Sequence, residues 1–390
     1  MAARNRMPLC PVLCIMEKVT VRITRRESII GCLLGTAVGD ALGLPAEGLS
    51  QQRQRRLLGH IENHRLLFGR GMISDDTEHT ILTAHALIVC GGSPDQFLCA
   101  LADKLRLWIL LVPAGVGFAT LRACLKLCIG ISPTRSGVFS AGNGPAMRAA
   151  LLGVCLGDEP EKLKAFVHAS ARLTHTDPKA EYGAFAVAFA AHHAAQNCSD
   201  GLRFADILRK SLPDNQNAAE LCGLVDRAAA SAARGEDTTA FAATLDGPPG
   251  RITGYVYQTV PVAIHAWLRF PNDYRSAVLG VIDCGGDTDT TAAITGAIVG
   301  AGGGEAGIPT PWIDGIAEWP YSVSWMRSLG GSLASANESD SGAKAQSVFW
   351  PALLLRNVFF LVVVVLTVLR YWVRDLCVTV RKILARFLPP

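Results

Sequence analysis

Long segments rich in Ala, Leu and Val, separated by Gly, Pro and polar clusters, run through this chain from Arg26 onward. Many are long enough for a helix, and the alternating β-branched pattern typical of strands is nearly absent. Hydrophobic residues make up 50% of the chain but aromatic residues only 7%, so the apolar excess is aliphatic and favours helices. We therefore expect an all-α domain over residues 28–327, with central helices that are apolar on most faces.

The positive charge is concentrated at the two ends of the chain. The formal net charge is +4, yet residues 1–27 sum to +4, residues 347–390 sum to +5 and the middle sums to −5. A nucleic-acid-binding protein needs a basic working domain, so the charge argues against nucleic-acid binding. Basic ends are better suited to anionic lipid headgroups.

The C-terminal part of the sequence predicts a membrane anchor. Residues 328–346 form a Gly/Ser/Ala-rich stretch without apolar periodicity, which predicts a flexible linker. Residues 348–369 are then apolar except for Arg356 and Asn357. A membrane span needs ~20 apolar residues, and a central Arg costs roughly 2.5–3.5 kcal/mol on insertion scales. With the basic amphipathic tail that follows, residues 347–390 are expected to associate with a membrane.

Several arrangements of this anchor are compatible with the sequence. A buried C-terminal helix would have the same composition, although the linker and the basic tail favour an anchor. Basic residues after Leu369 favour a cytoplasmic C-terminus, whereas twelve cysteines without a CxxC pair indicate a reducing compartment for the domain. A re-entrant helix, or one that lies in the membrane interface, reconciles both indications and leaves the domain facing the cytoplasm. Residues 1–27 are expected to be a basic, uncleaved extension.

Two acidic segments open apolar helices far apart in the chain, at Ser74–Glu78 and at Gly285–Thr291. Each on its own reads as an ordinary helix cap, because acidic residues favour helix N-termini. Together they supply four aspartates with Ser and Thr hydroxyls, which are the hard ligands that Mg²⁺ or Mn²⁺ prefers. The pair therefore predicts a dinuclear metal site.

A glycine-rich turn lies between the two acidic segments. Residues 140–145 read Ser-Ala-Gly-Asn-Gly-Pro and precede a predicted helix. Such a turn presents backbone N–H groups to an anion, so a phosphate or diphosphate would fit there, although a plain loop has the same composition.

These elements, in this order, resemble the ADP-ribosylglycohydrolase family. The matching stretches cover roughly residues 28–320 and include GCLLGTAVGDALGLPAEG at 31–48, SDDTEHT at 74–80, PAGVGFATL at 113–121, SAGNGPAMR at 140–148, LTHTDPKAEYGAFA at 173–186 and DCGGDTDTTAAITGAIVGA at 283–301. The resemblance implies an all-α orthogonal helical bundle that binds two Mg²⁺ or Mn²⁺ ions.

The resemblance also assigns roles to individual residues. It implies that the metal ligands are Ser74, Asp75, Asp76, Asp287, Asp289 and Thr290. It implies catalytic roles for Asp75, Asp76 and Glu47, and substrate contacts for Ser140, Gly142, Asn143, Gly144, Met147 and His175. Arg148 is either part of the same helix-and-turn unit or a structural partner of a nearby carboxylate.

The activity implied is hydrolysis of the glycosidic bond between ADP-ribose and an acceptor, which is a protein side chain or a small molecule. An ADP-ribosylated nucleic-acid acceptor stays open. The alternative is a non-catalytic, membrane-tethered module that binds ADP-ribose. The basic stretch QQRQRR at 51–56 lacks the aromatic residues that many relatives carry there, so acceptor specificity cannot be transferred.

Overall fold

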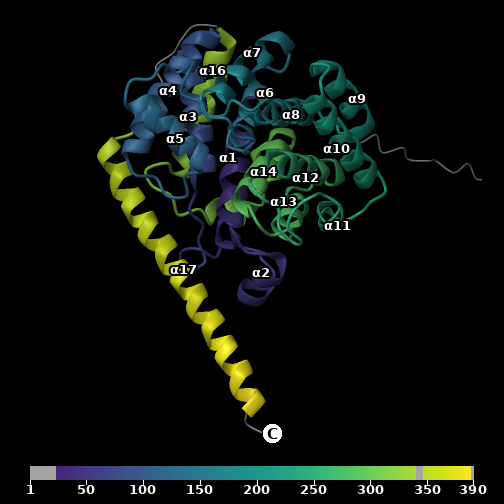
Figure 1. The fold of residues 1–390 in the computed structure, drawn as a ribbon. Helices are drawn as coiled ribbons and strands as arrows, with labels where there is room; N and C mark the ends of the chain where they lie inside the picture. Colours follow the sequence, from purple (N-terminus) through teal and green to yellow (C-terminus); the bar gives the residue numbers. More distant parts are fainter. Residues whose placement is uncertain (1–22, 340–345, 388–390) are drawn as a thin grey trace, which may run out of the picture.

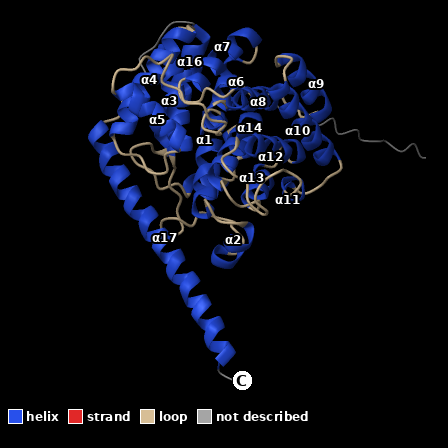
Figure 2. Ribbon diagram, viewed as in Figure 1, coloured by secondary structure: helices blue, strands red, loops and turns tan. Residues whose placement is uncertain are grey.

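The computed structural model describes residues 23–339 and 346–387, and within these ranges the chain is helical without a strand (Figure 2), which confirms the all-α prediction. The α-helices are α1 Arg25–Gly43, α2 Gln51–Leu58, α3 Asp75–Val89, α4 Pro94–Leu110, α5 Phe118–Cys128, α6 Ala150–Leu156, α7 Pro160–Arg172, α8 Pro178–Ala195, α9 Gly201–Ser211, α10 Gln216–Ala233, α11 Thr238–Ala242, α12 Val256–Arg269, α13 Tyr274–Ile282, α14 Thr288–Gly303, α15 Thr310–Asp314, α16 Val323–Ser339 and α17 Trp350–Phe387. Short 3₁₀ turns are η1 Leu44–Ala46, η2 Ala146–Arg148 and η3 Glu305–Gly307.

Helices α1 and α14 pack backbone to backbone at the centre of the molecule (Figure 1). Glycines recur at every fourth position of α1 and face small residues of α14. A Cβ atom added to Gly35 would lie 2.2 Å from the carbonyl oxygen of Gly296, and one added to Gly39 would lie 2.1 Å from that of Ala292. No side chain fits between the helices at these points, so the C-terminal end of α1 is held against the N-terminal start of α14.

Other helices surround this pair and place a second helix start beside it. Helix α3 packs against α1, α4 and α16, while α8 and α12 pack against α14. Buried aliphatic side chains fill the spaces between them and form one continuous core. The starts of α3 and α14, which carry the two acidic segments, therefore lie near the same end of α1.

Helix α16 corrects the prediction of a flexible linker for residues 328–339, the first part of the stretch 328–346. Residues up to Ser339 are helical, and Met326, Leu329 and Leu333 are fully buried against the core. Small residues allow this helix to approach α1 closely, since a Cβ atom on Gly330 would lie 2.9 Å from Cγ1 of Ile30. The Gly/Ser/Ala composition thus reflects close helix packing. Residues 340–345 lie outside the described residues.

Helix α17 lies along the side of the domain (Figure 1, yellow). By length and composition alone, two helical stretches of the described chain could cross a membrane, Arg25–Ala46 and Trp350–Cys377. The first is 89% buried and is the core helix α1, whereas the second is only 33% buried. The predicted N-terminal extension lies outside the described residues up to position 22, and α1 begins at Arg25 after the Thr24 cap.

Candidate functional site

The start of α3 is capped by a residue from another helix. The Oδ2 atom of Asp40, which is fully buried in α1, accepts hydrogen bonds from the backbone N–H of Ser74 at 2.9 Å and of Thr77 at 3.2 Å. It also accepts one from the Thr77 hydroxyl. Because Asp40 satisfies these groups, the carboxylates of Asp75 and Asp76 are not consumed as caps of their own helix. Sequence reasoning missed Asp40, although it lies in the GDALG stretch.

Two glycines shape the start of α14. Gly285 and Gly286 adopt φ values of 69° and 90°, which only glycine tolerates readily. Gly286 exchanges backbone hydrogen bonds of 2.7 Å with the segment after η1, donating to Leu49 and accepting from Gly48. The N–H of Asp287 donates to the Ile252 carbonyl at 2.7 Å. Three chain segments therefore meet where α14 begins.

The two acidic helix starts are in direct contact. The Thr290 hydroxyl donates to Oδ2 of Asp76 at 3.2 Å, and the Ser74 hydroxyl donates to the same oxygen at 3.3 Å. Asp76 and Asp289 are buried, and Asp75 is half-buried below the loop at Gly115. Thus residues that are more than 200 positions apart in sequence share one polar cluster.

Crowding of carboxyl groups dominates the electrostatics of this cluster. Burial, followed by repulsion from neighbouring carboxylates, raises the pKa of Asp75, Asp76 and Asp289 well above the usual range. Burial also raises the pKa of Asp40 to about 6. Glu47 faces the solvent on one side but is otherwise enclosed, and burial together with Asp287 and Asp40 raises its pKa to about 7.

The cluster has the donor chemistry of a cation site. Within the described residues, Oδ1 atoms of Asp40, Asp76 and Asp289 are buried without a hydrogen-bond partner. In that same part of the chain, no three His, Cys, Asp or Glu side chains are already gathered tightly enough to enclose an ion. Like charges repel one another in a buried cluster, and the Ser74 and Thr290 hydroxyls both donate to the other oxygen of Asp76, Oδ2.

The glycine-rich turn is tied to the α14 start through Asn143. Its side-chain amide donates to Oδ2 of Asp287 at 2.6 Å and to the Thr259 hydroxyl at 3.1 Å. The Asn143 carbonyl accepts from the N–H groups of Ala146 and Met147, which begin the short turn η2. The expected helix after the glycine turn is therefore split into η2 and α6, and its first N–H groups are already bonded. Ser140, Gly142 and Gly144 remain half-exposed.

His175 lies directly behind the glycine turn. It is 3% exposed, and Cβ atoms added to Gly142 and Gly144 would lie 3.0 Å from its Nε2 and 2.9 Å from its Cε1. Burial lowers its pKa to about 3, so the imidazole is neutral. Met147 is buried, and the fully buried Arg148 donates to Ser170, Thr174 and the Gly144 carbonyl. Arg148 therefore supports the turn rather than a carboxylate.

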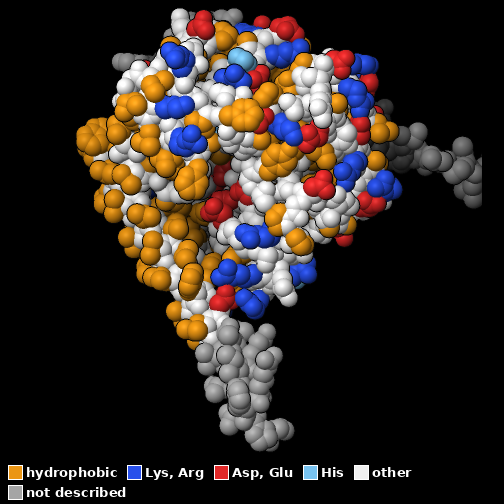
Figure 3. All heavy atoms as spheres, in the orientation of Figure 1, with side chains coloured by type: hydrophobic (Ala, Val, Ile, Leu, Met, Phe, Trp, Pro, Cys, Tyr) orange, Lys and Arg blue, Asp and Glu red, His pale blue; other side chains and the backbone are white. Residues whose placement is uncertain are grey.

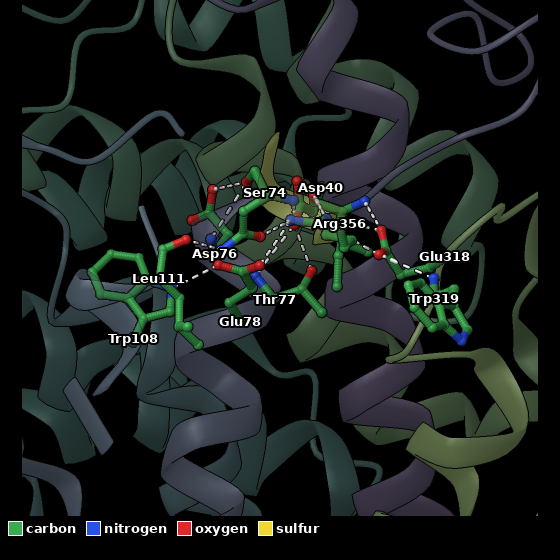
Figure 4. A network of polar contacts seen from close by, with 12 residues as sticks. Asp40, Ser74, Asp76, Thr77, Glu78, Trp108, Leu111, Glu318, Trp319 and Arg356 are labelled. Atoms are coloured by element: carbon green, nitrogen blue, oxygen red, sulfur yellow. Dashed lines mark hydrogen bonds and ion pairs between the residues drawn. The ribbon is translucent and has the colours of Figure 1, made fainter. Parts of the chain in front are cut away.

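A buried ionic network adjoins the start of α3 (Figure 4). Arg356 of α17 pairs with Glu78 at 2.8 Å and with Glu318 at 2.7 Å, and all three side chains are at most 4% exposed. Arg356 also donates to the carbonyl of Ile73, and Asn357 donates to that of Leu111 at 2.9 Å. Sequence reasoning treated this polar pair only as an interruption of the apolar segment. A charged and a polar residue within an otherwise apolar segment were the sequence signal for this buried network.

One face of the molecule carries an acidic hollow. In Figure 3, Asp and Glu side chains line a hollow between the apolar column along α17 and the rest of the domain, and Lys and Arg side chains gather below it around α2.

Comparison with known proteins identifies the family. A sequence profile described as ADP-ribosylglycohydrolase matches residues 22–342. An uncharacterised protein of Archaeoglobus fulgidus is 31% identical, covering 75% of this chain and 92% of that protein. ADP-ribosyl-[dinitrogen reductase] glycohydrolase of Rhodospirillum rubrum is 25% identical, covering 74% and 89%, and ADP-ribosylhydrolase ARH3 of Gallus gallus is 27% identical, covering 72% and 87%.

A solved structure supports the same fold. It is named as an ADP-ribosylglycohydrolase-related protein complex, and it matches with a TM-score of 0.62 and 24% identity over 80% of this chain and 99% of that one. The resemblance inferred from the motifs is confirmed: this chain belongs to the ADP-ribosylglycohydrolase family.

Proposed function

We propose that this chain hydrolyses the glycosidic bond between ADP-ribose and an acceptor, either a protein side chain or a small molecule. Family membership and the names of the relatives support this activity. The observation that carries it is the contact between Asp76 and Thr290, because it joins both acidic helix starts in one cluster.

We propose that the cluster binds two Mg²⁺ or Mn²⁺ ions. Its oxygen donors would be Ser74, Asp75, Asp76, Asp287, Asp289 and Thr290. The unpartnered buried oxygens of Asp76 and Asp289, found among the described residues, support this assignment, since a divalent cation would offset the repulsion that raises their pKa. When bound, such ions lower the pKa of a coordinated water toward neutrality.

The chain's own groups then handle the protons and the substrate. A water oxygen bonds to C1 of the ribose while the bond from C1 to the acceptor breaks. Asp75 or Asp76 takes the proton of the water, and Glu47, which faces the solvent on one side, gives a proton to the leaving acceptor. Nearby carboxylates stabilise the positive charge that develops on the ribose. The diphosphate lies against Ser140–Gly144, with Met147 and His175 behind the turn.

The direct test uses the purified full chain in a mild detergent with ADP-ribosylated arginine and serine peptides, with and without Mg²⁺. Release of ADP-ribose that depends on Mg²⁺ is expected. Failure with both peptides, together with retained binding of free ADP-ribose, would favour the alternative of a non-catalytic binding module.

A metal-ligand variant sharpens this test. Asp289→Asn is expected to lower both Mg²⁺ affinity and turnover, by about 100-fold or more, because a buried oxygen ligand loses its charge. Asp226→Asn, an exposed aspartate paired with Arg209 on the surface, is the matched control and should change neither. Affinity is read by isothermal titration calorimetry. Normal turnover in Asp289→Asn would contradict the dinuclear site.

We also propose that α17 rests on a lipid surface instead of spanning the bilayer. Crossing the bilayer would separate Arg356 from Glu78 and Glu318 and leave buried charges unpaired. The opposite side of α17 exposes a continuous apolar row, which we call the lipid face, made of Leu355, Phe359, Val362, Leu366, Leu369, Val373 and Leu376. More exposed apolar residues lie beside this row, so the apolar surface is broader than a coiled-coil seam. The unpaired cysteines of the described chain support a cytoplasmic domain.

Vesicle flotation tests the lipid face. The full chain should bind vesicles of phosphatidylcholine with phosphatidylserine and be released by alkaline carbonate, as a peripheral protein is. Leu366→Glu should lower binding about tenfold, whereas the equally drastic Leu202→Glu on α9 should not, although Leu202 is 69% exposed. Resistance to carbonate would instead indicate a span, and dimers unaffected by lipid would indicate that a second copy covers α17.

A further inference from the structure

Helix α17 contributes one wall of a cavity that is also lined by Glu47. The cavity has a volume of about 220 Å³ and lies between η1 and α17. Leu44, Pro45 and Glu47 line one side, and Val368, Tyr371 and Trp372 line the other. Ligand pockets for whole small molecules measure about 300–1,000 Å³, so this cavity suits a single side chain and not a dinucleotide-sized group.

Glu47 connects this cavity to the proposed chemistry. Its side chain lines the cavity, and its carboxylate interacts electrostatically with Asp287 and Asp40 and is influenced by Asp289. The glycine turn reaches the same cluster through a different contact, between Asn143 and Asp287. If ADP-ribose occupies the glycine turn, the cavity beside Glu47 is left for the acceptor part of the substrate.

The α17 wall is fixed to the domain on both sides of the cavity. Toward the start of α17, Arg356 forms the buried pairs with Glu78 and Glu318. At the cavity itself the Tyr371 hydroxyl donates to the Pro45 carbonyl at 2.9 Å, and further along Asp375 pairs with Arg53 at 2.8 Å. A wall held in this way keeps a defined shape, so it can discriminate between acceptors.

The residues that line the cavity indicate which kind of group it binds. Leu44, Val368 and Trp372 supply apolar surface, and Arg53, a cation in the lining, is already paired with Asp375. Because α17 lies beyond the region that matches the family profile, this wall belongs to the present chain and not to the shared domain.

We propose that the cavity between η1 and α17 is an acceptor subsite that binds an apolar side chain next to the ADP-ribosylated residue. This inference rests on the proposed hydrolase function. A single methylene group in a hydrophobic pocket is worth about 10–200-fold in discrimination, so peptides with an apolar neighbour are preferred by about tenfold or more.

The experiment compares two ADP-ribosylated peptides that differ only in having Leu or Ser beside the modified residue, on whichever of the arginine or serine acceptors is cleaved. Val368→Trp fills the cavity and should remove the preference for the Leu peptide, so that kcat/KM for the Leu peptide falls toward that for the Ser peptide. Val365→Trp is the matched control, because Val365 is equally exposed on the same helix (48% against 47%) without lining the cavity, and it should keep the preference. Circular dichroism checks folding, and Trp372→Ala, which enlarges the cavity, should weaken the preference independently.

A binding measurement separates failure of this inference from failure of the proposed function. Fluorescence anisotropy with labelled peptides on Asp289→Asn gives the Leu-to-Ser affinity ratio without turnover. Cleavage of both peptides at equal kcat/KM, or a preference that survives Val368→Trp, overturns the subsite. If no peptide is cleaved, the hydrolase function fails, and the affinity ratio alone then decides the subsite: a tenfold preference that Val368→Trp removes supports it, and equal affinities overturn it.

Discussion

His265 makes the fold sensitive to acid at a single residue, away from the acidic cluster. It is fully buried, contacts the hydroxyls of Ser231 and Thr238 at 3.2 Å and stacks on Phe241. Burial lowers its pKa from 6.5 to about 4, although Glu236 opposes the shift. In the unfolded chain this histidine therefore binds a proton near pH 6.5, whereas in the folded chain it binds one only near pH 4. The free energy of unfolding is therefore lost as the pH falls through this window.

We expect the free energy of unfolding to drop by about 3 kcal/mol across that window because of His265. In His265→Gln this contribution is absent, so stability should fall less steeply between pH 7 and 4.5 than in the unaltered chain. Urea titrations at several pH values measure the slope. An unchanged slope in the variant would show that other groups govern the acid response.

Single residues of the candidate site were predictable only in part. Ser74, Asp76 and Thr290 stand in acidic helix starts, and the structure does bring these three together. Asp40 carries no local sign of its role, because it caps a helix that begins 35 positions later. Capping across helices depends on tertiary packing, which no local pattern encodes.

At the scale of elements, the contact between α1 and α14 sets the spacing of the two acidic segments. Gly39→Ala would place a methyl group 2.1 Å from the Ala292 carbonyl oxygen, so the helices must separate. We expect a loss of about 3 kcal/mol or more in unfolding free energy, with reduced Mg²⁺ affinity, since overpacking is costly where only backbone can yield. Chemical denaturation and calorimetry measure the two effects.

The control for this prediction is Gly223→Ala in the interior of α10. No atom lies within 4 Å of the position that its Cβ would take, so the change should stabilise the helix by about 0.5–1 kcal/mol. Equal responses of the two variants would mean that the close approach of α1 and α14 does not limit stability.

Helices themselves were predictable where apolar spacing is strong, and less so where small residues dominate. The stretch after Ser328 lacks large side chains, and its composition is typical of a linker as much as of a tightly packed helix. Met326, Leu329 and Leu333 carry the apolar spacing of α16 across that boundary, and only their burial against α1 and α3 distinguishes the two cases. Composition alone does not reveal whether a surface such as that of α1 and α3 is available for the helix to pack against.

At the scale of the whole molecule, Arg356 joins α17 to the family domain. Arg356→Met leaves Glu78 and Glu318 buried without their cation, and we expect a loss of about 3–5 kcal/mol in unfolding free energy. Arg374→Met on the same helix removes one hydrogen bond, to the Leu57 carbonyl at 2.8 Å, and should cost under about 1 kcal/mol. Urea unfolding followed by tryptophan fluorescence measures both.

A compensated variant makes this prediction sharper. Arg356→Met combined with Glu78→Gln and Glu318→Gln removes the unpaired charges and should recover most of the lost stability. If Arg356→Met alone were as stable as Arg374→Met, α17 would be only loosely attached to the domain.

The same ionic network has a consequence for biosynthesis. Arg356 is translated after every helix from α1 to α16. Glu78 and Glu318 therefore lack the Arg356 guanidinium while the rest of the domain emerges from the ribosome. Domains tend to fold during synthesis in chain order, but this one completes its charge pairing last. Glu78 and Glu318 therefore gain their buried ionic partner only after α17, the last helix, has been made.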